Sequence, residues 1–244
     1  MRRVRIGIDV GGTFTDAVAI DDATQEIIAK AKRPTTHDAK EGVAEGIIEI
    51  LRDILTENNI APEEVVFIAH GTTQATNALL EGDVAKVGVI GMGSGFFAGR
   101  AASDTDVGDI TLAPGKYLRT AHAFIETDEA EPMRAEISRR IDELAEKGAA
   151  VIVASEAFGV DHPESERLVM ELAGEKGLPS TGGHEVSHLY GLKVRTRTAV
   201  INGSLIPRMM ETADMTEECV KRINIGAPLM IMRCDGGVMT ADEV

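Results

Sequence analysis

Three short runs near the N-terminus have the hydrophobic patterns of strands. Val4–Val10 is an apolar run that ends in Gly-Gly, Thr15–Ile20 contains small and β-branched residues, and Ile27–Lys32 alternates apolar and polar positions. Such runs, bounded by turns, are typical of strands. We therefore predict three short strands joined by tight turns.

A helical pattern follows the predicted strands. Asp38 stands at an N-cap position, and Glu41 three residues later would complete a capping box. From Val43 to Leu55 apolar residues recur at helical spacing, and Pro62 prevents continuation soon afterwards. This pattern predicts an amphipathic helix.

The rest of the chain alternates between the two kinds of element. Strands are predicted at 65–69, 86–92, 149–154 and 229–232, and helices at 74–80, 132–147, 163–176 and 198–223, the last interrupted at Pro207. Residues 100–116 show no clear period and are predicted to form a loop, and 180–194 a loop followed by a short strand. Such alternation predicts an α/β fold with a mixed sheet. We place a division near residue 104, which gives subdomains 1–103 and 104–244.

Composition narrows the class of partner. The formal net charge of −15 and the absence of Trp argue against nucleic acid. ATP remains compatible with this charge, because backbone N–H groups and a metal ion receive its phosphates. Cys219 and Cys234 have no metal-binding spacing, and no apolar run is long enough to span a membrane. We expect a cytoplasmic protein without a membrane partner.

The segment Asp9–Asp16, with the sequence DVGGTFTD, has the composition of a phosphate-binding turn. Paired glycines let the backbone approach a bulky anion, and threonine hydroxyls add donors. Asp9 is suited to hold Mg²⁺, usually through water. The alternative is a plain β-hairpin. The predicted cofactor-binding residues are Asp9, Gly11, Gly12, Thr13, Thr15 and Asp16, with Asp9 also as the metal ligand.

A second motif, HGTTQATN from His70 to Asn77, joins a predicted strand to a predicted helix. The N–H groups at a helix N-terminus suit an anion or a polarised carbonyl. His70 is a candidate for proton transfer. The alternative is that Thr72 or Thr73 only caps the helix and His70 is a satisfied histidine.

Four further patterns are weaker candidates. Gly93–Ala98 matches a dinucleotide fingerprint, but no acidic residue follows at the expected distance. His184 and His188 would face one metal if they were helical, although a helix there is doubtful because of the neighbouring glycines. The acidic run at 104–109 is predicted to be a solvated loop, and the turn at 235–237 is either plain or a second phosphate turn.

Several of these segments occur together in one known family. IGIDVGGTFTDAV, HGTTQATNALLEG, GGHEVS, RTAVINGSLIP and MIMRCDGGVMT appear in this order. The chain resembles the A subunit of hydantoinases, a family that also includes 5-oxoprolinase and acetone and acetophenone carboxylase subunits. The resemblance implies the N-terminal lobe of an actin-like (ribonuclease H-like) ATPase with an additional α/β subdomain. It also implies that this chain is an incomplete part of a longer architecture.

The resemblance further implies ATP-dependent opening of a cyclic amide, such as a hydantoin or 5-oxoproline. ATP, with Mg²⁺, would phosphorylate the amide carbonyl and so activate it towards water. Asp9, Gly11, Gly12, Thr13 and Thr15 match the family's first motif, and 70–73 with Asn77 match its second, in which His70, Thr72 and Thr73 are taken as catalytic. A B-type subunit or a missing C-terminal half is the expected partner.

Three other functions remain open at this point. A non-catalytic ATP-binding switch or reactivating protein would share the fold. An ATP-dependent ketone carboxylase subunit would share the family. A sugar or acyl kinase would share the phosphate turn, but it would not account for the HGTT segment.

Overall fold

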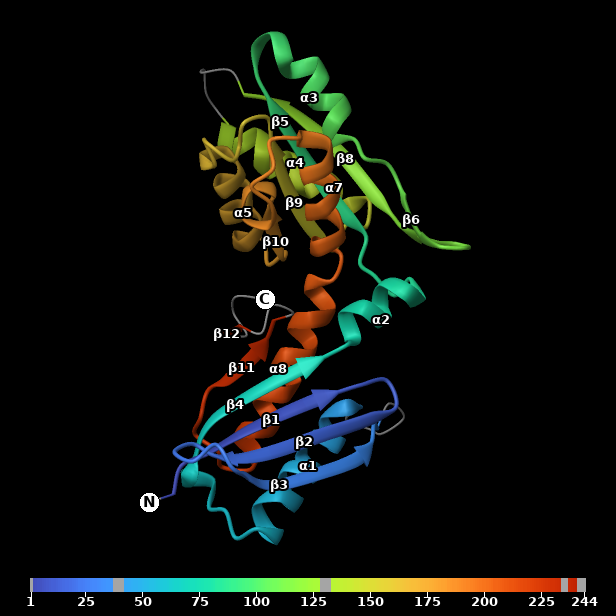
Figure 1. Cartoon of the computed structure of the whole chain (residues 1–244). Helices are drawn as coiled ribbons and strands as arrows, with labels where there is room; N and C mark the ends of the chain where they lie inside the picture. Colours follow the sequence, from blue (N-terminus) through green and yellow to red (C-terminus); the bar gives the residue numbers. More distant parts are fainter. Residues whose placement is uncertain (1, 37–41, 128–132, 234–236, 241–244) are drawn as a thin grey trace. The chain divides into compact units, whose positions relative to one another are not determined.

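The computed structural model describes residues 2–36, 42–127, 133–233 and 237–240 (Figure 1). They form two compact units: unit 1 comprises 1–77 and 209–244, and unit 2 comprises 78–208. The chain leaves unit 1 within α2 (Gln74–Glu81) and returns to it within α8 (Ile206–Arg222). These units differ from the division predicted near residue 104. The reason is that the C-terminal segment joins the N-terminal sheet, and such long-range pairing leaves no trace in local periodicity.

Among the described residues, unit 1 contains a sheet of six strands in the order β12-β11-β4-β1-β2-β3. The strands are β1 (Val4–Val10), β2 (Phe14–Asp21), β3 (Ile27–Pro34), β4 (Val65–Thr72), β11 (Leu229–Met232) and β12 (Val238–Thr240). The strands β1, β4 and β11 are parallel, whereas β2, β3 and β12 run antiparallel to their neighbours. This is the mixed sheet of an actin-like, ribonuclease H-like lobe, so the predicted fold class is confirmed.

The core of unit 1 lies on one face of this sheet. Along β1 the apolar residues are buried, while Arg5 and Asp9 are exposed. The helix α1 (Val43–Glu57), which the sequence predicted, packs its apolar stripe against this face together with α8. The thiol of Cys219 in α8 donates to the carbonyl of Ala44 in α1 (3.4 Å). Asp38 and Glu41, the predicted capping pair, lie outside the described residues. A short 3₁₀ helix, η1 (Pro62–Glu64), precedes β4.

Unit 2 has a parallel sheet in the order β10-β9-β5-β8. Its strands are β5 (Val87–Gly93), β8 (Thr120–Glu126), β9 (Val151–Glu156) and β10 (Ser180–Gly182). Every residue of β5 and β9 is buried, as expected for central strands covered on both faces. The helices α4 (Met133–Glu146) and α5 (Glu164–Glu175) cover one face, and α7 (Leu192–Gly203) and α3 (Ala98–Thr105) cover the other (Figure 1).

The segment predicted as a loop at 100–116 is the main local difference from the sequence-based expectation. It contains most of α3, the strand β6 (Ile110–Ala113), and the start of β7 (Lys116–Leu118), which pairs with β6. The buried residues of α3 are Ala98, Ala101 and Thr105, which are small and therefore give no hydrophobic period. The close packing of α3 against β5, and not a hydrophobic sequence pattern, accounts for this helix.

Most of the other predicted elements agree with the structure, apart from small shifts at their ends. Residues 180–194 differ: the strand β10 comes first, and the short helix α6 (Gly183–Val186) and the start of α7 follow it, where a loop followed by a short strand was predicted. The helix predicted over 198–223 is two helices, α7 and α8, with Pro207 near the start of the second. Within the described ranges, no helix is both long and apolar enough to cross a membrane.

Candidate functional site

The two principal motifs meet at one edge of the unit 1 sheet. The strands β1 and β4 are parallel neighbours, and their register sets Asp9 opposite Gly71. A Cβ placed on Gly71 would lie 3.7 Å from Asp9 Oδ1, and a Cβ on Gly12 would lie 3.4 Å from Asn77 Nδ2. The carboxyl ends of parallel strands are where α/β folds bind ligands. Residues that are far apart in sequence therefore form one site (Figure 1).

The turn after β1 depends on close approach of the backbone. The N–H of Gly11 donates to the carbonyl of Phe14 (3.0 Å), and a Cβ on Gly11 would lie only 3.1 Å from that oxygen. Neither Gly11 nor Gly12 has a positive φ angle. Glycine is favoured at Gly11 by crowding, not by a left-handed backbone.

Thr35, which the sequence did not single out, holds this turn in place. Its hydroxyl donates to the carbonyl of Gly11 (2.8 Å), and its N–H donates to the carbonyl of Thr13 (2.9 Å). Thr15 is fully buried, with its hydroxyl 3.2 Å from that of Thr35. Thr13 is exposed at the tip. Only the pairing of β2 with β3 brings Thr35 here, so no local pattern could have identified it.

The two predicted carboxylates lie opposite each other on the exposed face of the β1–β2 pair. Asp9 is in register with Asp16. The carboxylate of Asp16 accepts from Lys32 Nζ (2.9 Å), whose ammonium also lies 4.6 Å from the ring centroid of Phe14. In the part of the chain that the structure describes, no group of three or more potential metal ligands is found. Asp9 stands at the exposed end of β1, and Asp16 is held in its ion pair with Lys32.

His70 lies on the other, buried face of β4. It is fully buried and in register with Ile8 and Ile231. Among the described residues neither ring nitrogen has a hydrogen-bond partner. Burial lowers the pKa of His70 from 6.5 to about 4, so the imidazole is neutral near pH 7. A buried, unpaired polar ring costs about 1–3 kcal/mol, so packing alone does not explain its presence.

The start of α2 contributes the rest of the second motif. Thr73 is exposed, and its carbonyl accepts from the N–H of Asn77 (2.9 Å). The amide of Asn77 also lies 3.5 Å from the Thr73 hydroxyl. The backbone of Thr72 ends β4, but its side chain lies outside the described structure. The amide oxygen of Gln74 accepts from the Thr212 hydroxyl (2.7 Å), which ties α2 to α8 within unit 1.

The glycine motif at 93–98 has the strand–turn–helix context of a dinucleotide site, but its first glycine serves packing. A Cβ on Gly93 would lie 2.7 Å from the Cβ of Ala101. At the neighbouring Gly91 a Cβ would lie 2.0 Å from Thr105 Oγ1, which is itself 3.0 Å from His122 Nε2. These glycines let α3 approach β5 closely.

The histidine pair at 184 and 188 does not share a helical face, because α6 ends at Val186. Instead Nδ1 of His184 lies 2.6 Å from the carboxylate of Glu166, which also accepts from the His184 backbone N–H (2.8 Å). Glu166 is fully buried in α5 and was not identified from the sequence. It lies within an ordinary helical pattern, so the sequence gave no indication that this carboxylate is buried.

Two acidic residues of the 104–109 run form ion pairs with nearby arginines. Asp104 pairs with Arg100 (3.6 Å), and Asp109 pairs with Arg119 (2.5 Å). Residues 235 and 236 lie outside the described structure. The strand β11 before them runs parallel to β4, so its carboxyl end lies at the same edge of the sheet as the two motifs.

Two solved structures share the fold over almost the whole chain. Acetone carboxylase, in a nucleotide-free structure, gives a TM-score of 0.69 at 19% identity, covering 99% of this chain and 38% of that chain. ATP-dependent caprolactamase from Pseudomonas jessenii gives 0.68 at 23% identity, covering 97% and 36%. At these identities the likeness establishes the fold alone.

Sequence profiles define the family. The profile described as the hydantoinase/oxoprolinase N-terminal region matches residues 5–177, and the hydantoinase/oxoprolinase profile matches residues 195–244. The chain belongs to the hydantoinase/oxoprolinase family. The resemblance noted from the motifs is thereby confirmed.

Curated relatives extend well beyond this chain. The caprolactamase subunit alpha of Pseudomonas jessenii is 27% identical over 262 residues, covering 97% of this chain and 36% of the relative. The acetophenone carboxylase gamma subunit of Aromatoleum aromaticum is 25% identical over 267 residues, covering 95% and 35%. The chain thus spans little more than a third of the length of these relatives.

Proposed function

We propose that this chain provides the phosphate-binding lobe of an ATP-dependent enzyme that opens a cyclic amide. The observation that carries the proposal is the meeting of the Asp9–Asp16 turn with the His70–Asn77 segment at adjacent parallel strand ends. Each motif alone is compatible with a plain turn or a helix cap. Together they bring backbone N–H groups, hydroxyls and the Asp9 carboxylate to one edge of the sheet, a combination of groups that suits a metal-bound polyphosphate.

The side chains divide into those that contact phosphate and those that shape the turn. The N–H groups of the glycine turn and the exposed hydroxyl of Thr13 are the proposed phosphate donors. Asp9 would hold Mg²⁺, usually through water. Thr15 supports the turn from its buried side, through the contact of its hydroxyl with that of Thr35. Asp16, paired with Lys32, supports the exposed face near the metal position.

The proposed reaction uses ATP to activate the amide carbonyl. Its oxygen attacks the γ-phosphorus and ADP leaves. Water then attacks the carbon and the C–N bond breaks, which opens the ring and leaves an acyl phosphate; a second water hydrolyses the acyl phosphate to the carboxylate and phosphate. Thr72, the last residue of β4, and Thr73, just before α2, are proposed to orient the amide. His70 is neutral and enclosed in the described state, so it accepts a proton only after a movement that exposes its ring.

A partner is part of this proposal. Relatives that match this chain over little more than a third of their length are named as subunits, alpha in the caprolactamase and gamma in the acetophenone carboxylase. We propose that a B-type subunit, further sequence of the same protein, or both complete the catalytic site. We also propose a cytoplasmic location, since Cys219 is a buried thiol that is not part of a disulfide.

The test is ATP hydrolysis by this chain with its partner, with and without hydantoin, 5-oxoproline or caprolactam. A cyclic amide should stimulate hydrolysis, and Gly12→Val and Thr13→Ala should abolish the stimulation. Thr24→Ala changes an exposed threonine in another turn of the same strands, so it should leave the rate unchanged. Equal rates in all three variants would overturn the proposal.

Carboxylation of a ketone is a second candidate, because one relative is an acetophenone carboxylase subunit and the fold matches acetone carboxylase. The phosphate turn would serve this reaction equally well. The products distinguish the two activities. Ring opening yields an amino acid without incorporation of labelled bicarbonate, whereas carboxylation fixes the label in an acid.

A further inference from the structure

We propose that unit 2 contains a second ligand site, which binds a small molecule with a flat ring and one carboxylate. This inference does not depend on the proposed function. All of the residues that form the site belong to unit 2, and none belongs to the phosphate turn.

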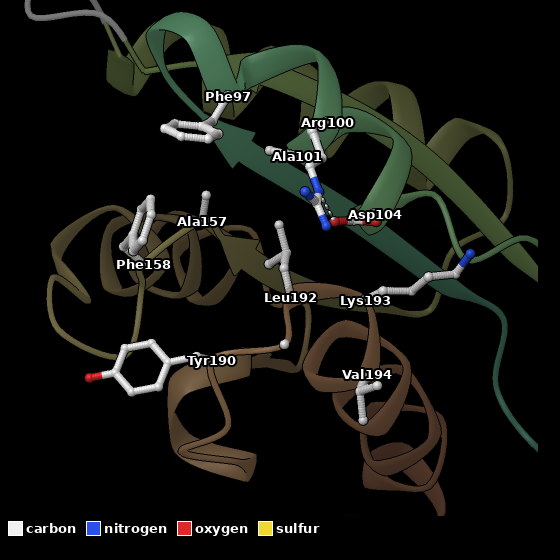
Figure 2. A pocket seen from close by; sticks show the side chains of 11 residues that line it. Phe97, Arg100, Ala101, Asp104, Ala157, Phe158, Tyr190, Leu192, Lys193 and Val194 are labelled. Atoms are coloured by element: carbon white, nitrogen blue, oxygen red, sulfur yellow. Dashed lines mark ion pairs between the residues drawn. The ribbon is translucent and has the colours of Figure 1, made fainter.

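The site is a pocket of about 400 Å³, a volume in the range that holds small ligands (Figure 2). It is lined by three segments: 97–104 after β5, Ala157 and Phe158 after β9, and 190–194 at the start of α7. The strands β5 and β9 are parallel neighbours, yet the chain visits β8, on the far side of β5, between them. Such a topological switch point opens a crevice at the carboxyl ends of the strands, where α/β sheets bind ligands.

One end of the pocket is aromatic. The whole chain contains only six Phe and two Tyr. Phe97, Phe158 and Tyr190 all line this pocket, with 52%, 57% and 67% of their surfaces exposed. The rings of Phe97 and Phe158 meet edge to face at 6.3 Å. Figure 2 shows these three rings gathered on one side of the pocket. Exposed rings at this density favour a flat, apolar ligand group.

The backbone at Phe158 supports a specific role for this ring. Its φ angle is 64°, in the left-handed region that bulky residues rarely adopt. Such conformations persist where the surrounding structure holds them, and they concentrate at functional sites. The turn that presents Phe158 is closed by the N–H of Asp161, which donates to the Phe158 carbonyl (2.9 Å).

The other end of the pocket carries a net single positive charge. Arg100 and Asp104 form an ion pair (3.6 Å) and cancel, which leaves Lys193. Lys193 is the second residue of α7, a helix of 12 residues whose N-cap, Gly191, supplies no side-chain cap. The N–H groups of this first turn therefore add partial positive charge to that of Lys193. One net charge matches a carboxylate better than a doubly charged phosphate.

A buried polar network fixes the walls of the pocket. Arg195 is fully buried and donates from Nη1 to the carbonyl of Leu189 (2.7 Å) and from Nη2 to that of Glu156. These carbonyls immediately precede Tyr190 and Ala157, so one side chain holds both loops. Glu166 accepts from the N–H of Glu156 (2.8 Å). Buried charges are unfavourable compared with apolar packing, so this network is better explained by a preformed site than by stability.

The test is an NMR titration of the chain with benzoate, a flat ring with one carboxylate. Amide shifts should concentrate at 157–158 and 191–194. Benzamide, which has the same shape without the charge, should bind about tenfold more weakly, as should the Lys193→Gln variant. Arg197→Gln removes an exposed charge one turn further along α7, outside the pocket, and should not change benzoate affinity.

Two Phe variants test the aromatic end of the pocket. Phe97→Ala should weaken benzoate binding about tenfold, whereas Phe96→Ala, a neighbouring ring that is 95% exposed and outside the pocket, should not. Gly12→Val, in the phosphate turn, should leave benzoate binding intact. The proposal is overturned if benzoate causes no localised shifts or binds no better than benzamide. Self-association that both Phe variants abolish, without benzoate binding, would instead identify a protein interface.

Discussion

At the residue scale, the turn between β1 and β2, which we propose binds phosphate, depends on how closely one carbonyl approaches Gly11. The oxygen of Phe14 would lie 3.1 Å from a Cβ at this position, and it belongs to the backbone, which cannot swing away as a side chain could. The same turn is fixed from below by Thr35. A single methyl group is therefore expected to disturb the hairpin.

We predict that Gly11→Ala lowers the free energy of unfolding by about 1 kcal/mol, within the range for overpacked positions. Gly174→Ala is the matched control, because a Cβ there meets nothing within 4 Å and the residue is in the helix α5. The control should raise stability by about 0.5 kcal/mol or more. Urea unfolding measures both. Equal effects of the two variants would show that crowding at Gly11 is unimportant.

The buried His70 predicts a pH dependence of stability. Its folded pKa is about 4 and its ordinary value is 6.5, so below about pH 6.5 the unfolded chain binds a proton that the folded chain does not. Stability should therefore fall as the pH drops from about 6.5 to about 4 and then level off. Between about pH 7.5 and about pH 5.5 the loss should be about 1 kcal/mol.

His70→Leu should remove this dependence, because leucine does not titrate. It should also leave the unfolding free energy at pH 7.5 unchanged or higher, since it replaces two unpaired buried nitrogens with apolar atoms. Urea unfolding of both proteins at several pH values gives the difference, which cancels contributions of other groups such as His122. A common pH slope in both proteins would contradict the burial of a neutral ring.

At the element scale, one helix of unit 2, α3, packs closely against the sheet. The helix α3 lies close to β5 because Gly91 and Gly93 leave room for Thr105 and Ala101. Thr105 then donates to the carbonyl of Ala101 (2.8 Å) within α3. Local hydrophobicity does not report such a contact, which explains why α3 was predicted to be a loop.

Gly91→Ala should therefore lower the stability of unit 2 by about 3 kcal/mol. The new Cβ would lie 2.0 Å from Thr105 Oγ1 and 2.9 Å from His122 Nε2, so α3 would have to move. Gly99→Ala, in the same helix with nothing within 4 Å, should instead be neutral or stabilising by about 0.5 kcal/mol. Thermal unfolding compares them. If Gly91→Ala is as stable as Gly99→Ala, the close packing is wrong.

At the scale of the whole molecule, two units are made from one chain that leaves the first and returns to it. Unit 2 holds all the strands of its sheet within 78–208, whereas unit 1 needs β11 and α8 from the end of the chain. Val220 of α8 and Ile231 of β11 belong to the same apolar cluster as Ile6 of β1. The N-terminal segment alone therefore lacks part of its own core.

We predict that a fragment of residues 78–208 folds alone, as judged by dispersed NMR amide signals, and that a fragment of residues 1–77 does not. Joining residues 1–77 to 209–244 through a short Gly/Ser linker should restore folding of unit 1. The hydrogen bond from Thr212 to Gln74 (2.7 Å) shows that the ends to be joined are near each other. A folded 1–77 fragment would contradict the need for the C-terminal segment.

The sequence predicted the secondary-structure elements and the residues of the site to different extents. The apolar run of β1 and the helical period of α1 each predict one element, and both elements are present. The Asp9–Asp16 and His70–Asn77 segments were recognisable as candidate motifs because their chemistry is concentrated in a few consecutive residues. Thr35, Glu166 and Arg195 were not, since each acts through a partner that is distant in sequence.

The sequence by itself determined the α/β class, the family and the two motifs, because periodicity and short motifs are properties of neighbouring residues. The tertiary structure alone decided that Asp9 and Gly71 lie side by side, that His70 is enclosed, and that the chain divides at 77 and 208. It also decided that three exposed aromatic rings gather around one pocket. These features depend on which strands pair, and pairing is set by the combined burial of many distant residues.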